Sequence, residues 1–325
     1  MKYSELLKFC LLSFLLCAVA GSCLRDKRVS CDGEIIVGTL RGPSSVAMIK
    51  LMDSLGRDSS SQIRVRLFSE PMQIRKEMIE GSLDFAVLPT TMAALSYNKG
   101  MDYRVAAIPL WGSLFLCGSD TTVRALSDLK GEKVYLMAKG MTPDILFRHL
   151  LVRSGLEPGI DVELDYRFPT HIDLANAAIS GRAGMCVLTE PYLSQALNSN
   201  PRLHVLMDLD LIWQSVENCR EAQTAFLCKG KLADSRRDMV EKLVNAYRTS
   251  SEWVKAHPDS AAFLCAANNI NPDTISLMQS IPRTNINVVE AAMAEQDIME
   301  YLKVFFGMSP ESIGSRMPDE KFIVK

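Results

Sequence analysis

The sequence predicts an α/β protein of two lobes, each built on a mixed, mainly parallel sheet and joined by a hinge that the chain crosses twice. Three observations lead to this fold class. Strand-like apolar segments alternate with helical segments, the same strand–helix order occurs twice, and a long apolar run separates the two copies. Strands that alternate with helices form parallel sheets with right-handed crossovers.

A weak internal repeat carries most of this prediction. In each copy a Gly-Glu pair begins a strand, an Arg-Gly or Lys-Gly pair makes the turn, and a helix follows that ends at Gly56 or Gly155. A second strand, a second helix ending at Gly81 or Gly181, and a short apolar strand complete each copy. The first copy comprises 33–37, 44–55, 63–68, 72–80 and 85–88, and the second comprises 131–136, 144–154, 162–168, 172–180 and 185–188.

Two segments are candidates for the hinge. The long apolar run Ala106–Gly118 is expected to cross between the lobes, and Ala222–Cys228 is the second candidate. Two crossings allow rigid lobes to rotate about a hinge. The remaining chain has helical spacing over 233–257, 272–278 and 288–306. We therefore expect lobe 1 over 33–112, lobe 2 over 113–225, and the completion of lobe 1 with the C-terminal helices over 226–325.

Bulk composition fits this size and excludes one class of partner. The chain has 325 residues, 48% hydrophobic and 23% charged, which is enough for two domains. Its 36 basic and 38 acidic residues give a net charge of -2. A broad nucleic-acid surface requires a clustered basic excess, so we expect no nucleic-acid partner.

The N-terminus has the composition of an export signal. Lys2 and Lys8 give a basic start, and residues 9–20 are almost wholly apolar, which is too short to cross a bilayer. Two processing alternatives stay open: cleavage after Ala20, and acylation of Cys23 in a lipobox-like segment in which Ala20 stands where Leu is preferred.

Export and anchoring follow from this N-terminal segment. We expect residues 1–23 to be a signal peptide or lipobox and residues 24–32 to be a tether. The protein is then exported to the bacterial periplasm or cell surface. In the lipoprotein alternative, several acyl chains on Cys23 anchor it to the membrane.

The nine cysteines and four histidines define no metal site or disulfide framework. Cys117 and Cys186 lie in apolar, strand-like runs and are expected to be buried hydrophobic residues. Cys219 and Cys228 are close enough in sequence to pair, and their state is left open. No CxxC pair occurs and the histidines are scattered, so we expect no metal and no cofactor.

Ligands of parallel sheets bind beyond the carboxyl ends of the strands, which makes the turns there candidate binding segments. Helix N-termini in these turns carry free N–H groups and partial positive charge, and hydroxyls beside them suit an anion. Helix capping explains the same hydroxyls without a ligand. The candidates are Arg41, Ser44, Ser45, Thr90 and Thr91 in lobe 1, Lys139, Thr142, Glu190 and Tyr192 in lobe 2, and Trp111 and Gln223 near the crossings.

Each candidate also has a structural interpretation. Arg41 and Lys139 are equally explained as solvated loop charges, and Glu190 as an acid that the helix dipole stabilises. A residue such as Trp111 is more often part of the core than a ligand platform, and His171 follows a strand, where it can enter the cleft.

No HExxH, P-loop or GxSxG motif occurs, so we expect no catalytic residues and no enzyme. Asp208 and Asp210 are better explained as a loop after a strand than as paired carboxylates.

Four segments, in this order, resemble one known family. They are Arg41-Gly42-Pro43-Ser44-Ser45, Gly81-Ser82-Leu83-Asp84-Phe85-Ala86-Val87, the segment 126–134, and Glu190-Pro191-Tyr192. From about Gly33 to Phe306 the chain resembles the type II periplasmic binding proteins of ABC importers, in the nitrate/sulfonate/taurine and thiamine-precursor group. The resemblance implies two Rossmann-like lobes, a small-molecule ligand held in the interlobe cleft by hinge closure, and an ABC transporter permease as partner.

The ligand and some alternatives stay open at this point. Arg41, Lys139 and the hydroxyls favour a small anion such as a sulfonate. Trp111, Tyr192 and Glu190 favour a flat amino-heterocycle such as a pyrimidine precursor of thiamine. An enzyme on the same scaffold, acting on a pyrimidine or menaquinone precursor, is the alternative function, and export argues against it. An exported ligand sensor is a third possibility.

Overall fold

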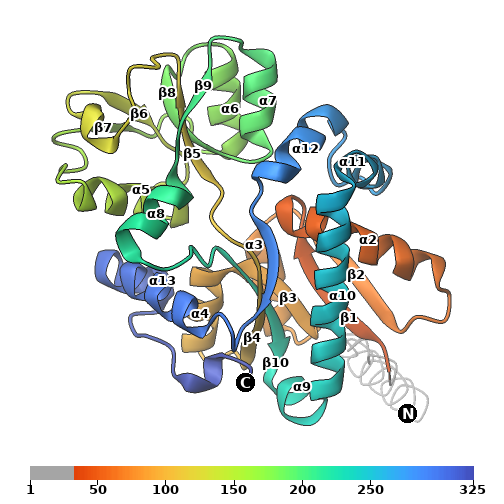
Figure 1. Ribbon diagram of the computed structural model, residues 1–325. Helices are drawn as coiled ribbons and strands as arrows, with labels where there is room; N and C mark the ends of the chain where they lie inside the picture. The colour runs from red at the N-terminus through yellow and green to blue at the C-terminus, as the bar shows by residue number, and fades with distance from the viewer. Residues whose placement is uncertain (1–32) are drawn as a thin grey trace, which may run out of the picture. The chain divides into compact units, whose positions relative to one another are not determined.

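Two mixed sheets organise the chain in the computed structural model, which describes residues 33–325 (Figure 1). Sheet A has the strand order β11-β4-β10-β3-β1-β2 and sheet B the order β7-β6-β8-β5-β9. Sheet A contains β1 (Ile35–Leu40), β2 (Ile63–Phe68), β3 (Phe85–Pro89), β4 (Tyr103–Leu110), β10 (Thr224–Lys229) and β11 (Ile286–Glu290). Sheet B contains β5 (Leu114–Gly118), β6 (Lys133–Tyr135), β7 (Glu163–Asp165), β8 (Met185–Thr189) and β9 (His204–Asp208).

Helices connect and cover these strands. We call sheet A with α2–α4 and α9–α13 lobe 1, and sheet B with α5–α8 lobe 2. The helices of lobe 1 are α2 (Pro43–Arg57), α3 (Pro71–Ile79), α4 (Thr90–Asn98), α9 (Gly230–Ser235), α10 (Arg237–Ala256), α11 (Pro258–Ala267), α12 (Thr274–Ser280) and α13 (Glu295–Met308). Those of lobe 2 are α5 (Thr142–Arg153), α6 (His171–Ile179), α7 (Tyr192–Ser199) and α8 (Leu209–Glu217).

The two sheets have equivalent topologies, as the internal repeat predicts. The order β2-β1-β3-β10-β4 in sheet A corresponds to β7-β6-β8-β5-β9 in sheet B. In both, the first three strands are parallel and the fourth is antiparallel to its neighbours. Gly81 and Gly181, which follow equivalent helices, both have positive φ values, 71° and 70°, that favour glycine. The predicted α/β fold class with two mixed sheets is confirmed. Among residues 33–325, four of the strand pairs in these sheets are parallel and five are antiparallel.

The chain passes between the two sheets twice, and after each crossing it adds a strand to the sheet that it reaches: β5 to sheet B and β10 to sheet A. The first crossing joins β4 in sheet A to β5 in sheet B, inside the predicted segment 106–118. The second runs from α8 through residues 218–223 into β10, so sheet A receives the chain at Thr224, just before the expected boundary at 225/226. The division into lobes at residues 112/113 and 225/226 stays a proposal.

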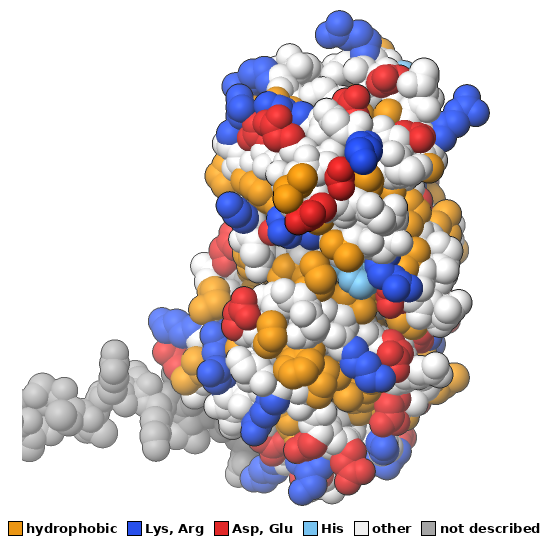
Figure 2. Space-filling model, turned by 90° about the vertical axis from the view of Figure 1, so that its left-hand side faces the viewer, with side chains coloured by type: hydrophobic (Ala, Val, Ile, Leu, Met, Phe, Trp, Pro, Cys, Tyr) orange, Lys and Arg blue, Asp and Glu red, His pale blue; other side chains and the backbone are white. Residues whose placement is uncertain are grey.

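The central strand β3 of sheet A is buried on both faces, and it is almost continuously apolar, as such strands are. Phe85 and Val87 of β3 face the core under α2 and α10, whereas Ala86 and Leu88 face the core that includes α3, α4 and α13. Phe85 stacks on Phe226 of the neighbouring strand β10, with ring centroids 5.4 Å apart. On the face shown in Figure 2, basic and acidic side chains are interspersed between apolar patches, as the nearly balanced charge predicts.

The predicted helical segment 233–257 is confirmed, but it contains a break that the spacing did not reveal. The chain forms α9 and α10, and Arg236 between them has the non-helical angles φ -139° and ψ 48°. The Ser235 hydroxyl donates to the carbonyl of Lys231 at 2.6 Å, a side-chain bond back to the preceding turn. Such bonds compete with continuation of a helix.

The predicted helix over 288–306 is partly wrong. Its first residues belong to β11, and α13 begins only at Glu295. Ile286 and Val288 are both 3% exposed and alternate with outward residues, which is the period of a strand. Their partner strand is β4, far away in sequence, so local spacing could not reveal the pairing. A smaller error concerns Gly56, which lies inside α2, since that helix ends at Arg57.

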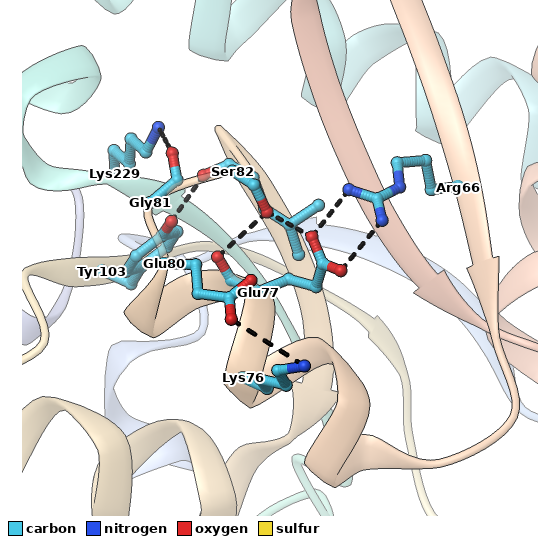
Figure 3. Close-up of polar contacts among 9 residues, drawn as sticks. Arg66, Lys76, Glu77, Glu80, Gly81, Ser82, Tyr103 and Lys229 are labelled. Atoms are coloured by element: carbon cyan, nitrogen blue, oxygen red, sulfur yellow. Dashed lines mark hydrogen bonds and ion pairs between the residues drawn. The ribbon is translucent and has the colours of Figure 1, made fainter. Parts of the chain in front are cut away.

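The segment Gly81–Val87, which carries part of the family resemblance, has a structural role (Figure 3). Glu77 accepts a fork of two bonds from Arg66, at 2.8 and 3.0 Å, and also accepts from the Ser82 hydroxyl. Asp84 accepts from the amide of Ile36 at 2.9 Å and pairs with Lys229 at 3.0 Å. These contacts lie at the amino ends of β1 and β3, so this segment stabilises the sheet and does not line its carboxyl edge.

Several predictions fall on residues 1–32, outside the described part of the chain: the signal segment, lipidation of Cys23, and the tether. Between residues 33 and 325, no helix is long and apolar enough to span a bilayer. Cys219 and Cys228 are free thiols in this structure, not a disulfide.

Candidate ligand-binding cleft

The carboxyl edges of both sheets meet at the crossings. In sheet A, Pro89 and Leu110 end β3 and β4, and both pair with Thr224, the first residue of β10. In sheet B, Thr189 ends β8 and pairs with Leu114, the first residue of β5. The crossings therefore start and finish at the two carboxyl edges, where α2–α4 of lobe 1 and α5–α7 of lobe 2 begin. This is the edge at which α/β sheets bind ligands.

Two predicted residues join the lobes directly. Thr91 in the first turn of α4 and Thr142 at the start of α5 share a hydrogen bond of 3.2 Å between their hydroxyls. Thr91 is 6% exposed, so the contact is largely shielded from water. The N-termini of helices from opposite lobes are thus within hydrogen-bond distance of each other.

The neighbouring hydroxyl of Thr90 is buried and unsatisfied. Thr90 is fully buried at the first position of α4, and its amide donates to the carbonyl of Gln223 at 3.0 Å. Its hydroxyl has no hydrogen-bond partner among residues 33–325. A buried polar group without a partner costs about 1–3 kcal/mol. A ligand or an ordered water at this edge can supply the missing bond.

Ser44 and Ser45 make local bonds at the start of α2. The Ser45 hydroxyl and the backbone of Gly42 exchange bonds at 3.0 and 3.1 Å, which is a capping arrangement. Ser44 donates to the carbonyl of Leu40 at 3.3 Å and accepts from Thr39 at 3.2 Å. Both serines therefore have partners inside lobe 1, as the capping interpretation requires.

The two predicted cations are exposed. The Arg41 guanidinium donates one of its five N–H groups to the carbonyl of Asn269, which leaves donors for a ligand. Lys139 places its ammonium 5.1 Å from the centroid of the Tyr166 ring, a cation–π distance. The two lie at equivalent positions, in the turns after β1 and β6.

Glu190 is committed to other protein groups. Its side chain is 0% exposed, and one carboxylate oxygen, Oε1, pairs with Arg283 Nε at 2.6 Å. The other oxygen, Oε2, accepts from the amide and hydroxyl of Ser194 at 3.0 and 2.8 Å. Arg283 also donates to the Ser194 hydroxyl at 2.6 Å. Because Arg283 follows α12 of lobe 1, this cluster is an ionic contact between the lobes.

Tyr192 lies beside a buried histidine. Its ring stacks on His171, with centroids 5.6 Å apart, and the histidine Nδ1 lies 3.1 Å from the Thr189 hydroxyl. Burial lowers the pKa of His171, which favours the neutral imidazole. Burial raises the pKa of Tyr192, and the negative charge of Glu70 in lobe 1 adds to the shift. This pair of rings lies at the starts of α6 and α7, at the carboxyl edge of sheet B.

Trp111 and Gln223 hold the crossings together. Trp111 is 2% exposed, its indole N–H donates to the carbonyl of Asn287 at 2.7 Å, and the Arg220 guanidinium lies 3.7 Å from its ring centroid. Gln223 accepts from Ser113 at 3.1 Å, which links the second crossing to the first. The described contacts place Trp111 in the packing of the hinge.

Two acids are buried at the hinge: Asp210, which the sequence analysis assigned to a loop, and Glu221, which it missed. Asp210, the second residue of α8, accepts from Gln214 at 2.8 Å and from Asn285 of lobe 1 at 3.0 Å. Burial raises the pKa of Asp210 to about 6. Glu221 is 0% exposed, and within residues 33–325 neither of its carboxylate oxygens has a partner. Burial raises the pKa of Glu221 well above its usual range.

These residues carried no signal that could have revealed them. Arg283, Asn285 and Glu221 lie in no motif, and they come to the hinge only because the second crossing returns the chain to sheet A. The expectation that Asp208 and Asp210 lie in a loop after a strand is wrong, because Asp208 is the last residue of β9 and Asp210 lies in α8. The Asp208 carboxylate caps α8 by accepting from the amides of Asp210 and Leu211 at 3.0 and 3.3 Å.

Two surface pockets lie elsewhere. One, of about 540 Å³, is lined by Arg104, Asp234, Arg237, Lys321 and neighbours, and the other, of about 210 Å³, by Gly181, Arg202 and neighbours in lobe 2. Neither is lined by a residue that the sequence predicts to bind ligand.

Comparison with solved structures agrees with this geometry. An ABC transporter structure from Parabacteroides distasonis is 28% identical, with a TM-score of 0.78 over 90% of this chain and 99% of that one. The chain has the type II periplasmic binding protein fold. The periplasmic aliphatic sulphonate binding protein SsuA from Escherichia coli (18% identity, TM-score 0.69, 87% and 96% covered) shares it.

A further neighbour is the alkanesulfonate-binding protein SsuA from Xanthomonas axonopodis pv. citri, whose structure was solved with MOPS bound (14% identity, TM-score 0.61, 90% and 96% covered). No family model matches this sequence, and no curated protein sequence matches it. The expected resemblance to periplasmic binding proteins of ABC importers, of the sulfonate type, is confirmed by these structures.

Proposed function

We propose that this protein is the extracytoplasmic, lipid-anchored substrate-binding component of an ABC importer, and that it closes its lobes around a small organic anion such as a sulfonate. The observation that carries the proposal is the meeting of the two carboxyl edges, where helix N-termini of opposite lobes are joined through Thr91 and Thr142 at 3.2 Å. The solved neighbours are solute-binding proteins of transport systems, which supports binding without turnover.

Charge at the cleft supports an anionic ligand. Arg41 and Lys139 stand in equivalent turns of the two lobes, and both are exposed. The first turns of α2 and α4 carry no acidic residue, so the partial positive charge of these two helix ends is not neutralised there. The buried hydroxyl of Thr90 adds an unpaired donor at the same edge.

The flat heterocycle has less support. That hypothesis uses Trp111 as a stacking platform and Glu190 as a carboxylate partner. The Trp111 ring already faces the Arg220 guanidinium at 3.7 Å, and both Glu190 oxygens already have partners. Only Tyr192 remains as a candidate platform for such a ligand.

The test is a ligand screen of the protein lacking residues 1–23, stripped of bound ligand by unfolding and refolding. Sulfonates, taurine, nitrate and pyrimidines are compared by thermal shift and then calorimetry. A ligand at 100 times its Kd adds about 2.7 kcal/mol of stability, an easily measured shift. We expect a sulfonate to bind and to be recovered unaltered by mass spectrometry. A consumed compound would indicate an enzyme.

Variants sharpen the choice of ligand class. Arg41→Ala and Lys139→Ala should each weaken sulfonate binding by about 10- to 100-fold, because each removes a charged hydrogen bond of roughly 1.5–3 kcal/mol. The matched control is Arg124→Ala. Arg124 is an exposed cation that follows the last residue of β5, whereas the carboxyl edge of sheet B lies at the first residue of that strand. A pyrimidine that binds equally well to wild type and Arg41→Ala would contradict the anion proposal.

Lipid anchoring is tested separately, because Cys23 lies outside the described residues. Cys23→Ser should release the protein from the membrane fraction, whereas Cys31→Ser should leave it there. If the wild type and both variants are all found in the soluble fraction and not in the membrane fraction, cleavage after Ala20 is the correct alternative.

A further inference from the structure

Two cysteines in the core of lobe 2 face each other across neighbouring strands. Cys117 of β5 and Cys186 of β8 are directly opposite in the antiparallel register. Their sulfur atoms are 3.5 Å apart, and the Cys117 thiol also lies 3.2 Å from the carbonyl of Cys186. Both residues are 0% exposed.

This spacing is close to that of a disulfide. A disulfide joins sulfurs at about 2.05 Å and accepts Cα separations of about 4.4–6.8 Å, a range that includes directly opposite residues of antiparallel strands. Small rotations of the two side chains therefore bring the sulfurs into bonding distance without a shift in register. Cys219, Cys228 and Cys265 are buried free thiols too, but this sulfur–sulfur contact belongs to Cys117 and Cys186.

We propose that Cys117 and Cys186 form a cross-strand disulfide in the exported protein as lobe 2 folds. The proposal rests on the export that is part of the proposed function, because disulfides form and persist in oxidising compartments. The oxidant is a dithiol–disulfide reagent, either a small disulfide or a disulfide-bearing protein.

The reaction proceeds by two thiol–disulfide exchanges. One cysteine loses its proton, attacks the oxidant's disulfide and releases the first oxidant thiolate. The second cysteine loses its proton, attacks the mixed disulfide at the protein sulfur and releases the second. Two cysteine thiols are oxidised by two electrons, and one oxidant disulfide becomes two thiols after both protons are taken up.

Burial sets when this reaction occurs. The thiolate is the nucleophile, and in the folded lobe the hydrogen bond with Cys186 and burial raise the pKa of Cys117 well above its usual range. The folded dithiol is therefore slow to react, so the bond forms before the core of lobe 2 closes over the two strands. Once formed, the same burial shields it from reductants.

The bond would fasten the strand that enters lobe 2 from the hinge. β5 is the first strand after the first crossing, and it pairs with β8, which leads to Glu190. The cross-link spans 69 residues of chain, and disulfides that close long loops restrict the unfolded chain most. The oxidised lobe should therefore resist unfolding better than the reduced lobe.

The test refolds the protein lacking residues 1–23 from reductant and denaturant, once in buffered oxidised and reduced glutathione and once in reduced glutathione alone. Each sample is alkylated under denaturing conditions and mapped by mass spectrometry without reduction. We expect one linked pair of peptides, which joins Cys117 to Cys186 and has a mass 2 Da below the sum of the two unmodified peptides. The four other cysteines of this chain should be alkylated: Cys31, Cys219, Cys228 and Cys265. The oxidised form should melt several degrees above the reduced form.

Controls make the result specific. Cys265→Ala should keep the linked pair, and Cys186→Ala should leave Cys117 alkylated. Alkylation of all six cysteines after oxidative refolding, or the linking of Cys117 to another cysteine, would overturn the proposal. So would full alkylation of Cys117 and Cys186 in protein taken from the cell envelope. Because refolding requires neither ligand nor transport, its outcome is independent of the ligand screen.

Discussion

Whether a side chain at the carboxyl edges of the sheets is available to a ligand depends on partners that are distant in sequence. Glu190 was a candidate for the ligand, but its carboxylate is bonded to Arg283 at 2.6 Å, 93 residues along the chain. Thr90 shows the opposite case, since its hydroxyl is buried without a partner among the described residues. A single sequence cannot distinguish a committed side chain from an available one, because the difference lies in long-range contacts.

Removal of the unpaired hydroxyl should separate stability from binding. Thr90→Val keeps the shape of the side chain and removes a buried donor without a partner, so the ligand-free protein should be stabilised by about 1 kcal/mol. If the ligand supplies that partner, its affinity should fall about tenfold. Thermal unfolding and calorimetry measure both effects. Thr91→Val, which removes a hydroxyl bonded to Thr142, is the control and should destabilise; unchanged affinity in Thr90→Val would show that the ligand does not contact this hydroxyl.

Asp210 should make the folded protein less stable as pH rises, which is the opposite of the usual effect of a carboxyl group. Its pKa is about 6 in the folded protein and near 3.8 when unfolded. Between these values the folded state holds a proton that the unfolded chain has released, so its contribution to stability falls as pH rises from about 4 to 6. Asp210→Asn removes this loss and should gain roughly 2 kcal/mol relative to wild type between pH 4 and pH 7.

Urea unfolding across that pH range checks the sign. Asp208→Asn should weaken this pH dependence without removing it, because the charge of Asp208 adds to the raised pKa of Asp210 and asparagine keeps the cap of α8. Parallel pH profiles for wild type and Asp210→Asn would mean that the carboxyl group titrates normally in the folded protein.

At the scale of elements, the internal repeat was the strongest guide. It located β1–β3 and β6–β8 with their helices, because apolar periodicity and turn glycines are local signals. It failed for elements defined by their neighbours: β11 was assigned to a helix, and the break at Arg236 between α9 and α10 was missed. The same holds for the candidate site. Its turns after strands were predicted from local signals, whereas Arg283, Asn285 and Glu221, which distant segments bring there, were not predicted.

The contact between α7 and the turn after α12 should control how the lobes close. Glu190→Gln removes the charge of the ion pair but can keep a bond to Ser194, whereas Arg283→Gln leaves a buried carboxylate without its cation. We expect Arg283→Gln to destabilise the protein by about 2 kcal/mol, below the usual cost of breaking a buried pair, because Arg283 is 37% exposed.

Lobe closure in these variants is measured without knowledge of the ligand. Both should increase the radius of gyration of the ligand-free protein in X-ray scattering, with the larger change for Arg283→Gln. Glu290→Gln removes the partner of Arg248 within lobe 1, 2.9 Å away, and should leave the radius unchanged. Equal radii in all four proteins would show that the pair does not hold the lobes.

At the scale of the molecule, closure depends on two crossings that are packed against each other. The first passes Trp111, Gly112 and Ser113, and the second returns through residues 218–223. The Ser113–Gln223 bond of 3.1 Å joins them, and Asp210 packs where a side chain on Gly112 would be. In a hinge of this kind, a few residues absorb the change in backbone angles when the lobes rotate. Substitution of a small residue there should therefore have a large effect on lobe closure.

Gly112→Ala should therefore impair closure more than it impairs folding of either lobe. A Cβ atom at this position would overlap Asp210 Oδ1 and lie 2.6 Å from the Asp210 Cβ, so the first crossing and α8 must separate. We expect a larger radius of gyration without ligand and an affinity reduced by at least tenfold, because ligand binding must then also force the first crossing and α8 together. Gly56→Ala is the matched control, since a Cβ there meets nothing within 4 Å inside α2. If Gly112→Ala binds ligand as tightly as Gly56→Ala and has the same radius, the crossings adapt without cost, and the contact of Asp210 with Gly112 has no part in setting the angle between the lobes.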